Sequence, residues 1–315
     1  MIFNVLCGCT EIVPKGSLRE NPSIESYLPT HPSISTVLTH AAATTSESAA
    51  LTLPRMDYFL PFSYLFLHTP EATTMCGRYV LIDGQKVFAT FMLLQNMKNT
   101  GKVFEELPRY NVAPFQRMPV VAVRDQKLTA EQMRWGLIPH WSKDGKVAFS
   151  TFNAKAETLD QSKLYNTYFK GSRCLIPADG FYEWKKAAVT KEVRGAERQV
   201  IEKQPMCIRM KDESPFMFAG LFSVWKDAEG KEFPSYTIIT TSPNELVGEI
   251  HDRMPVILPE KEFERWLDRD FKDTAALKKI LVSYPAKKMK AYRVSTVVSS
   301  SRNDVPECVE PLEKK

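Results

Sequence analysis

Short runs rich in β-branched and aromatic residues recur from residue 76 onward, and they constrain the fold more than any other feature. The clearest runs cover Tyr79–Ile82, Pro119–Val123, Met206–Met210, Phe216–Trp225, Ser235–Thr241 and Tyr292–Val298. Helical patterns are fewer and cover Gln85–Met97, Ala154–Phe169, Pro259–Leu267 and Thr274–Val282. Many strands with a few helices between them predict one α+β domain, built on a curved, largely antiparallel sheet or open barrel with flanking helices.

Residues 1–74 differ from the rest of the chain. They are rich in Ser, Thr and Pro and show no amphipathic period. We therefore interpret them as a disordered extension or a mis-assigned start, and we place the domain at residues 75–315. Within that domain, Lys185–Gln204 is charged and poor in apolar residues, which predicts a solvated insertion.

The predicted domain is basic. Residues 1–74 hold 3 basic and 6 acidic residues, so the remainder holds 42 − 3 = 39 basic and 37 − 6 = 31 acidic ones, a net charge of about +8. A basic protein suits a polyanionic partner, because each neutralised phosphate releases counterions. Charge alone does not single out nucleic acid, since many proteins with no nucleic-acid role are equally basic.

Cysteine usage excludes several kinds of site. The chain has six cysteines, at Cys7, Cys9, Cys76, Cys174, Cys207 and Cys308. None forms a C-x-x-C pair, and the pair at 7 and 9 is too isolated for zinc, so we expect no metal and no cofactor. For all but Cys76 the expectation is a reduced, mostly buried thiol in a reducing compartment. No run approaches the roughly 18 apolar residues of a membrane span, so we expect no membrane partner.

Cys76 directly follows Met75, as in a protein whose initiator methionine is removed. As a first residue it would carry a thiol and a free α-amine on adjacent carbons, a pair that can close a five-membered ring on an aldehyde. In the chain as written the nitrogen is part of an amide. The ring therefore requires translation to start at Met75 or the chain to cut itself there. An internal Cys76 would be an ordinary buried thiol.

Two stretches hold candidate acid–base groups. His251 lies between a short helical stretch and an apolar strand, and histidine is the side chain that titrates nearest physiological pH. A structural histidine is the alternative. Glu183 lies in Asp179–Trp184, where Gly180 indicates a turn and the alternation suits a strand with two unlike faces. Glu183 then faces inward if Phe181 does, and an inward carboxylate needs either a task or an arginine partner.

Two further stretches are candidates for nucleic-acid contact. Arg134–Trp141 mixes basic residues with Trp135 and Trp141, as surfaces that stack on single-stranded bases do, although core packing explains the tryptophans equally well. Asn153–Glu157 opens a predicted helix, where Asn153 is either the N-cap or a functional amide.

Together these stretches resemble the SRAP (SOS response-associated peptidase) family. The matching stretches follow the family's order and cover essentially all of residues 76–315. They are Cys76–Tyr79, Tyr110–Pro114, Trp135–Pro139, Asn153–Glu157, Arg173–Trp184, His251–Pro255 and Ser301–Asn303. Each is weak alone, but seven in the same order are specific.

The resemblance implies a DNA-repair protein that senses abasic sites in single-stranded DNA and cross-links itself to the lesion. It also implies an intracellular monomer, located in the cytoplasm or nucleoid of a bacterium or in the nucleus of a eukaryote. The implied catalytic residues are Cys76, Asn153, Glu183 and His251. The predicted DNA-binding residues are Arg78, Trp135, Lys155 and Arg253. The family has arginine where this chain has Lys155, and lysine keeps the charge but loses the bidentate fork.

The chemistry of the lesion agrees with this role. An opened abasic deoxyribose exposes an aldehyde at C1′, and an α-amine with a reference pKa of about 7.7–8.0 is partly neutral at pH 7 and can condense with it. The thiol then adds to the imine carbon and closes a thiazolidine. In this scheme Glu183 moves the proton of the amine, and His251 protonates the departing ring oxygen. Asn153 orients the cysteine or the lesion.

The same residues account for the peptidase name. The Cys76 thiol can attack the Met75 carbonyl, assisted by His251 and Glu183, to leave a thioester that water cleaves. Two other functions stay open. One is a general cysteine hydrolase acting on outside substrates. The other is a non-covalent single-stranded DNA-binding module, for which Trp135, Trp141 and Arg78 would suffice.

Overall fold

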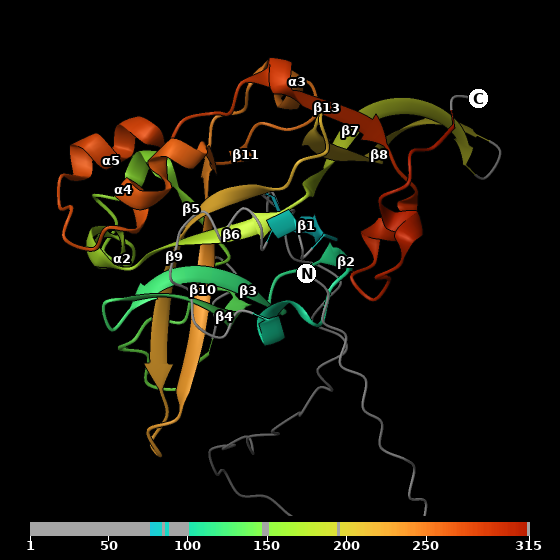
Figure 1. The fold of residues 1–315 in the computed structure, drawn as a ribbon. Helices are drawn as coiled ribbons and strands as arrows, with labels where there is room; N and C mark the ends of the chain where they lie inside the picture. The colour runs from blue at the N-terminus through green and yellow to red at the C-terminus, as the bar shows by residue number, and fades with distance from the viewer. Residues whose placement is uncertain (1–75, 84–85, 88–100, 147–150, 194–195, 314–315) are drawn as a thin grey trace, which may run out of the picture. The chain divides into compact units, whose positions relative to one another are not determined.

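The computed structural model in Figure 1 describes residues 76–83, 86–87, 101–146, 151–193 and 196–313. Its α-helices are α2 (Asn166–Gly171), α3 (Glu245–Gly248), α4 (Phe263–Leu267) and α5 (Thr274–Ile280). Its strands are β1 (Arg78–Leu81), β2 (Arg109–Val112), β3 (Arg117–Arg124), β4 (Lys127–Trp135), β5 (Asn153–Lys155), β6 (Arg173–Ala178), β7 (Gly180–Val193), β8 (Ala196–Met210), β9 (Phe216–Lys226), β10 (Glu232–Thr241), β11 (Met254–Pro255), β12 (Ile257–Leu258) and β13 (Met289–Arg293). Short 3-10 helices are η1 (Gly101–Phe104), η3 (Ala156–Thr158), η4 (Glu260–Glu262), η5 (Ala286–Lys288), η6 (Thr296–Ser299) and η7 (Pro306–Cys308).

Strand β10 closes the larger sheet into a barrel. From β10 the hydrogen-bonded neighbours run β4, β3, β6 and β9, and β9 pairs with β10 again. All these pairings are antiparallel except β4 with β10, which is parallel. The predicted α+β domain on a curved, largely antiparallel sheet is confirmed. Two short strands also pair with β10: β5, which carries Asn153, and β11, which follows the loop that carries His251.

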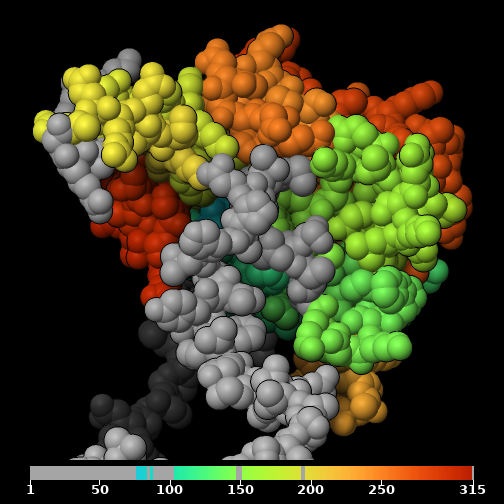
Figure 2. Space-filling view, turned by 180° about the vertical axis from the view of Figure 1, so that it is seen from behind, coloured from blue at the N-terminus to red at the C-terminus, as the bar shows by residue number. Residues whose placement is uncertain are grey.

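A second sheet runs in the order β13, β8, β7, β1 and β2. Strands β7 and β8 form a long hairpin that contains the predicted insertion Lys185–Gln204. The described side chains of its distal half are mostly exposed, and Figure 2 shows this part in yellow, projecting at the upper left. The insertion is therefore solvent-facing, as predicted, and it is built as regular β structure.

Aromatic side chains fill the barrel, and they include Trp135. Its ring is 0% exposed and lies parallel to that of Tyr236 at 6.3 Å, and its Nε1–H donates to the Phe152 carbonyl at 2.8 Å. The prediction that Trp135 contacts DNA is wrong, because the ring is buried in the core and has no face open to a base, so the core-packing alternative holds. Trp141, six residues on, is 64% exposed.

The helices predicted near the C-terminal end of the chain are confirmed, and the one predicted in the middle is not. The helices predicted at Pro259–Leu267 and Thr274–Val282 are confirmed by η4 with α4 and by α5. The helix predicted at Ala154–Phe169 is wrong, since this segment holds part of β5, then η3 and the start of α2. Of the helix predicted at Gln85–Met97, only residues 86–87 are described, and they are helical.

The last predicted strand, Tyr292–Val298, ends early. Strand β13 stops at Arg293, and η6 follows within three residues. The amide of Asn111 in β2 explains the change of course, because it donates to the carbonyls of Val298, Ser300 and Asn303 at 3.1, 2.9 and 2.7 Å. These bonds hold the C-terminal segment against β2. Within the described ranges, no helix has the length and hydropathy needed to span a membrane.

Candidate active site

Cys76 lies just before β1, and the pairing of β1 with β7 brings it beside Glu183. The two strands run antiparallel with Arg78 opposite Tyr182, so the residues before Arg78 run alongside those after Tyr182. The backbone N–H of Cys76 donates to Glu183 Oε1 at 2.9 Å. Cys76 is 2% exposed and Glu183 is 1% exposed. The predicted inward orientation of Glu183 is confirmed, and its partner is a backbone amide rather than an arginine.

Gly180 makes this arrangement possible. It is the first residue of β7 rather than the predicted turn. A Cβ built at Gly180 would lie 2.8 Å from Arg209 Cγ and 2.9 Å from the Ile208 carbonyl oxygen, both in the neighbouring β8. Only glycine therefore allows β7 and β8 to approach closely at the point where β7 begins.

The backbone of Cys76 is strained at its junction with Met75. Its φ is +30°, which lies in the left-handed region that residues with a Cβ rarely adopt. Such a conformation costs on the order of 1–3 kcal/mol and persists only where the surroundings enforce it. The hydrogen bond to Glu183 and the one from Asn153 Nδ2 to the Cys76 carbonyl, at 3.3 Å, are two such restraints.

Burial perturbs both the thiol and the carboxyl group. It raises the pKa of Glu183 to about 8, although hydrogen bonds from the Cys76 side chain and backbone act in the opposite direction. Burial is also the largest cause that raises the pKa of the Cys76 thiol well above its ordinary value, and the charge of Glu183 is the second. At neutral pH the site therefore holds a protonated thiol next to a largely protonated carboxylic acid, and the thiol needs a proton acceptor to become a nucleophile.

The loop between α3 and β11 completes the site. The Cys76 thiol donates to the Arg253 carbonyl at 3.8 Å, and the Arg253 backbone N–H donates to His251 Nδ1 at 3.2 Å. Asp252 Oδ1 lies 3.1 Å from the same Nδ1, and His251 Nε2 lies 3.8 Å from Glu183 Oε2. This separation is longer than a hydrogen bond, so a proton passes between the two groups only through a substrate atom or a water.

Strand β10 positions two parts of this site. Asn153 in β5 lies opposite Ile238 of β10 in a parallel pairing, and Met254 in β11 lies opposite Thr241 of the same strand. Asn153 is thus a strand residue, and its predicted role as a helix N-cap is wrong. The structure brings together Cys76, Asn153, Glu183 and His251, the four predicted catalytic residues.

Comparison with known proteins identifies this arrangement. The family model for "SOS response associated peptidase (SRAP)" matches residues 75–301, which is more than half of the chain. The chain belongs to the SRAP family. This confirms the resemblance predicted from the sequence motifs.

The SRAP relatives match over different shares of their length. Abasic site processing protein YoqW of Bacillus subtilis is 38% identical over 239 residues, which are 75% of this chain and 99% of YoqW. Abasic site processing protein HMCES of Xenopus tropicalis is 35% identical over 234 residues, 64% of this chain and 65% of that protein. A crystal structure of a Bacteroides thetaiotaomicron protein aligns with a TM-score of 0.62 and 26% identity, covering 76% of this chain and all of the other.

The predicted DNA-binding residues of this SRAP chain differ in their exposure and in their ion-pair partners. Arg78 is partly buried, its Nη1 donates to the Gly77 carbonyl at 3.0 Å, and burial lowers its pKa. No carboxylate pairs with Arg78 among the described residues, and Lys155 is exposed. The Arg253 side chain is only 14% exposed, and its guanidinium is already paired with Glu157.

Two contacts in this SRAP site were missed by sequence reasoning. The Arg253 carbonyl accepts the thiol, and no sequence signal marks a backbone acceptor. Glu157 pairs with Arg253, and its position at the end of the motif Asn153–Glu157 was the available signal. Within the described ranges, no three His, Cys, Asp or Glu side chains gather into a set that could bind a metal ion.

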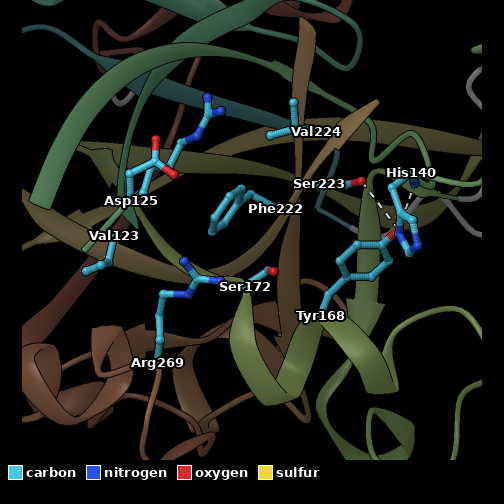
Figure 3. Close-up of a pocket in the computed structure, with 10 residues that line it drawn as sticks. Val123, Asp125, His140, Tyr168, Ser172, Phe222, Ser223, Val224 and Arg269 are labelled. Carbon is cyan, nitrogen blue, oxygen red and sulfur yellow. Dashed lines mark hydrogen bonds between the residues drawn. The ribbon is translucent and has the colours of Figure 1, made fainter. Parts of the chain in front are cut away.

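A pocket of about 240 Å³ lies beside His140 and is lined by none of the predicted site residues. In Figure 3 the Tyr168 hydroxyl lies between His140 and Ser223. It accepts from the His140 backbone N–H at 3.0 Å, contacts His140 Nδ1 at 2.8 Å and accepts from Ser223 Oγ at 3.3 Å. These bonds anchor the segment that carries the exposed Trp141.

Proposed function

We propose that this chain processes abasic sites in single-stranded DNA by forming a covalent bond to the lesion through Cys76. Relatives in Bacillus subtilis and Xenopus tropicalis are named abasic site processing proteins. The observation that carries the proposal is the contact of the Cys76 nitrogen with the buried carboxyl of Glu183. The Glu183 carboxyl, which can donate or accept a proton, thus contacts the nitrogen that must attack the aldehyde.

The reaction that fits this geometry has two stages. The free α-amine of Cys76 adds to C1′ of the opened sugar and loses water, which gives an imine. The thiol then adds to the imine carbon, its proton goes to the nitrogen, and the thiazolidine ring closes. Glu183 transfers protons to and from the nitrogen, and His251 protonates the ring oxygen of the sugar as the ring opens. Overall, one water leaves for each cross-link formed.

The amine must first be released from Met75. We propose that either translation starts at Met75 and the initiator methionine is then removed, or the Cys76 thiol attacks the Met75 carbonyl to give a thioester that water cleaves. The match to the SRAP family model begins at residue 75, immediately before the cysteine. The strained φ of Cys76 supports cleavage as well, because a chain that begins at Cys76 has no φ restraint to satisfy.

Single-stranded DNA is held by cations and one exposed aromatic in this proposal. Arg78 and Lys155 provide charge for phosphates, and Trp141 offers an open ring face for a base. The net charge of about +8 on residues 75–315, 39 basic against 31 acidic residues, favours the encounter.

The cross-link itself is the decisive test. Abasic single-stranded DNA is incubated with the full 315-residue chain and with a chain started at Met75, then run on a denaturing gel. We expect a shifted band from at least the shorter form, and none from Cys76→Ser or from protein whose α-amine has been acetylated. A shifted band from neither form of the wild type would contradict the proposal.

Self-cleavage has its own test. The intact mass of the full chain, measured after expression and purification, should correspond to loss of residues 1–75. Cys76→Ala should keep the whole extension, because it lacks the nucleophile. Wild-type protein that retains the extension would rule out the self-cleavage route and leave a start at Met75.

The two alternatives make different predictions. A general cysteine hydrolase would keep its turnover when the α-amine is blocked. A non-covalent DNA-binding module would bind equally well as Cys76→Ser and leave no denaturation-resistant band.

A further inference from the structure

Arg253 is the residue through which the catalytic loop is tied to the rest of the domain. Its carbonyl accepts the Cys76 thiol and its N–H donates to His251, so its backbone contacts both groups that the proposed chemistry uses. A shift of the Arg253 backbone would change both contacts together, the one to the thiol and the one to the imidazole. What holds Arg253 in place therefore decides the geometry of the reaction.

The Arg253 side chain is held by Glu157. Nη1 and Nη2 donate to the two carboxylate oxygens at 2.8 and 2.9 Å, in the bidentate geometry that gives arginine–carboxylate pairs their directionality. Nη2 also donates to the Thr240 carbonyl at 2.7 Å, which fixes the guanidinium to β10. Hydrogen bonding from Arg253 lowers the pKa of Glu157, so the carboxylate is charged at neutral pH.

Glu157 is itself anchored from behind. It lies in η3, directly after the strand that carries Asn153. Lys278 Nζ donates to the Glu157 carbonyl at 3.1 Å and to Asp160 Oδ1 at 2.9 Å, which ties this turn to helix α5. The Glu157–Arg253 pair thus links a turn fixed to the helical layer with the loop that carries His251.

We propose that Glu157 is a positioning residue for the reaction at Cys76, acting through Arg253, and that this pair aligns the thiol and the imidazole. The inference rests on the proposed function. It gives Arg253 a different task from the predicted phosphate contact, because its guanidinium is bound to Glu157 and Thr240.

The test compares Glu157→Gln with Glu213→Gln in the full 315-residue chain. Glu213 is a matched control, since it pairs with Lys290 at 2.7 Å on the other sheet and touches no catalytic residue. Single-turnover cross-linking is measured against the concentration of abasic single-stranded DNA. Glu157→Gln should lower the rate at saturating DNA by about 10-fold or more, with the half-saturating concentration unchanged, because misplaced groups slow the chemical step.

A phosphate-binding role for Arg253 predicts the opposite result, a change in DNA affinity with little change in the rate at saturating DNA. Freeing its guanidinium would then tighten DNA binding, and Arg253→Gln would weaken it and lower the salt dependence, with little change in the rate at saturation. Either result overturns the inference. If Glu157→Gln does not fold, Arg253→Lys decides, because lysine keeps the charge and loses the fork, and we expect the same fall in the saturating rate.

A second readout does not depend on DNA. The rate at which iodoacetamide alkylates Cys76 is followed by peptide mass spectrometry in wild type, Glu157→Gln and Glu213→Gln. A loosened loop should raise the Glu157→Gln rate severalfold, and equal rates in all three would overturn the inference. The alkylation assay measures the thiol alone and needs no cross-link. If the wild type forms no cross-link, the proposed function is contradicted, and the alkylation rates still decide whether Glu157 positions Cys76.

Discussion

At the scale of single residues, the buried carboxyl of Glu183 shapes the site. It has no cationic partner among the described residues closer than His251, and it accepts the Cys76 N–H. A neutral acid at this position can return a proton to a nitrogen, and its conjugate base can remove one. The burial that creates this capacity also destabilises the folded protein whenever the group ionises.

The stability of the protein should therefore depend on pH through Glu183. The folded state keeps this proton up to a pKa of about 8, whereas the ordinary value is 4.5. Between these values the folded state binds more protons than the unfolded state, so stability falls as pH rises. Glu183→Gln has no proton to lose. Urea unfolding should show it gaining stability over wild type from pH 5 to 8, by at most about 5 kcal/mol, with no gain below pH 4.

The exposed Glu213→Gln variant serves as the control for this measurement. The hydrogen bond from Lys290 lowers the pKa of Glu213, so this carboxylate adds stability as pH rises, and Glu213→Gln should show no gain over wild type between pH 5 and 8. A Glu183→Gln gain of the same size at all pH values would contradict an ionisation origin.

The two tryptophans of the Arg134–Trp141 stretch should behave in opposite ways. Trp135→Ala removes a fully buried ring and should lower the unfolding free energy by about 3–5 kcal/mol. Trp141→Ala should leave stability nearly unchanged and weaken binding of single-stranded DNA by about 1–3 kcal/mol. Thermal unfolding and fluorescence anisotropy separate the two effects. Equal DNA affinity for Trp141→Ala and wild type would remove Trp141 from the DNA surface.

At the scale of elements, the β7–β8 hairpin has two parts with different tasks. Its base carries Glu183 and packs against β1 and β13. Its distal part is exposed, with Ile201 at 61%. The base is thus needed to place the carboxyl, whereas the distal part contributes little buried surface.

Shortening the hairpin tests this division. Residues 188–201 are replaced by Asn-Gly, which joins Ala187 to its cross-strand partner Glu202 through a two-residue turn. The unfolding free energy should change by less than about 1 kcal/mol, because few apolar contacts are lost. Cross-linking of abasic single-stranded DNA should proceed at the wild-type rate. A slower reaction with weaker DNA binding would show that the distal hairpin contacts DNA.

At the scale of the whole molecule, DNA binding should be strongly salt-dependent. Lys155 is exposed. It follows the buried Ala154 and is the last residue of β5, the strand that carries Asn153. If it neutralises one phosphate, Lys155→Gln should reduce the slope of log K against log salt by about 0.7 for a single strand. Titrations between low and moderate salt measure this slope. Lys191→Gln, whose charge pairs with Glu202 on the hairpin, should leave it unchanged.

Local patterns predicted the elements well where one face is buried. The alternation around Phe181 and Glu183 placed the carboxyl inward correctly, because the residue period of a strand fixes which side chains share a face. The helix at Ala154–Phe169 failed because its apolar spacing fits a helix, whereas tertiary pairing with β10 holds its first residues extended. Local spacing also could not separate Trp135 from Trp141.

The sequence by itself determined the family and the α+β class, and it predicted four residues whose chemistry suits an aldehyde lesion. Only the tertiary structure decided which groups meet. The Cys76 nitrogen and Glu183 are 107 residues apart, and Arg253 and Glu157 are 96 apart. Their contacts arise from the register of β1 on β7 and from the strands gathered on β10, and register depends on long-range pairing and burial rather than on local propensity.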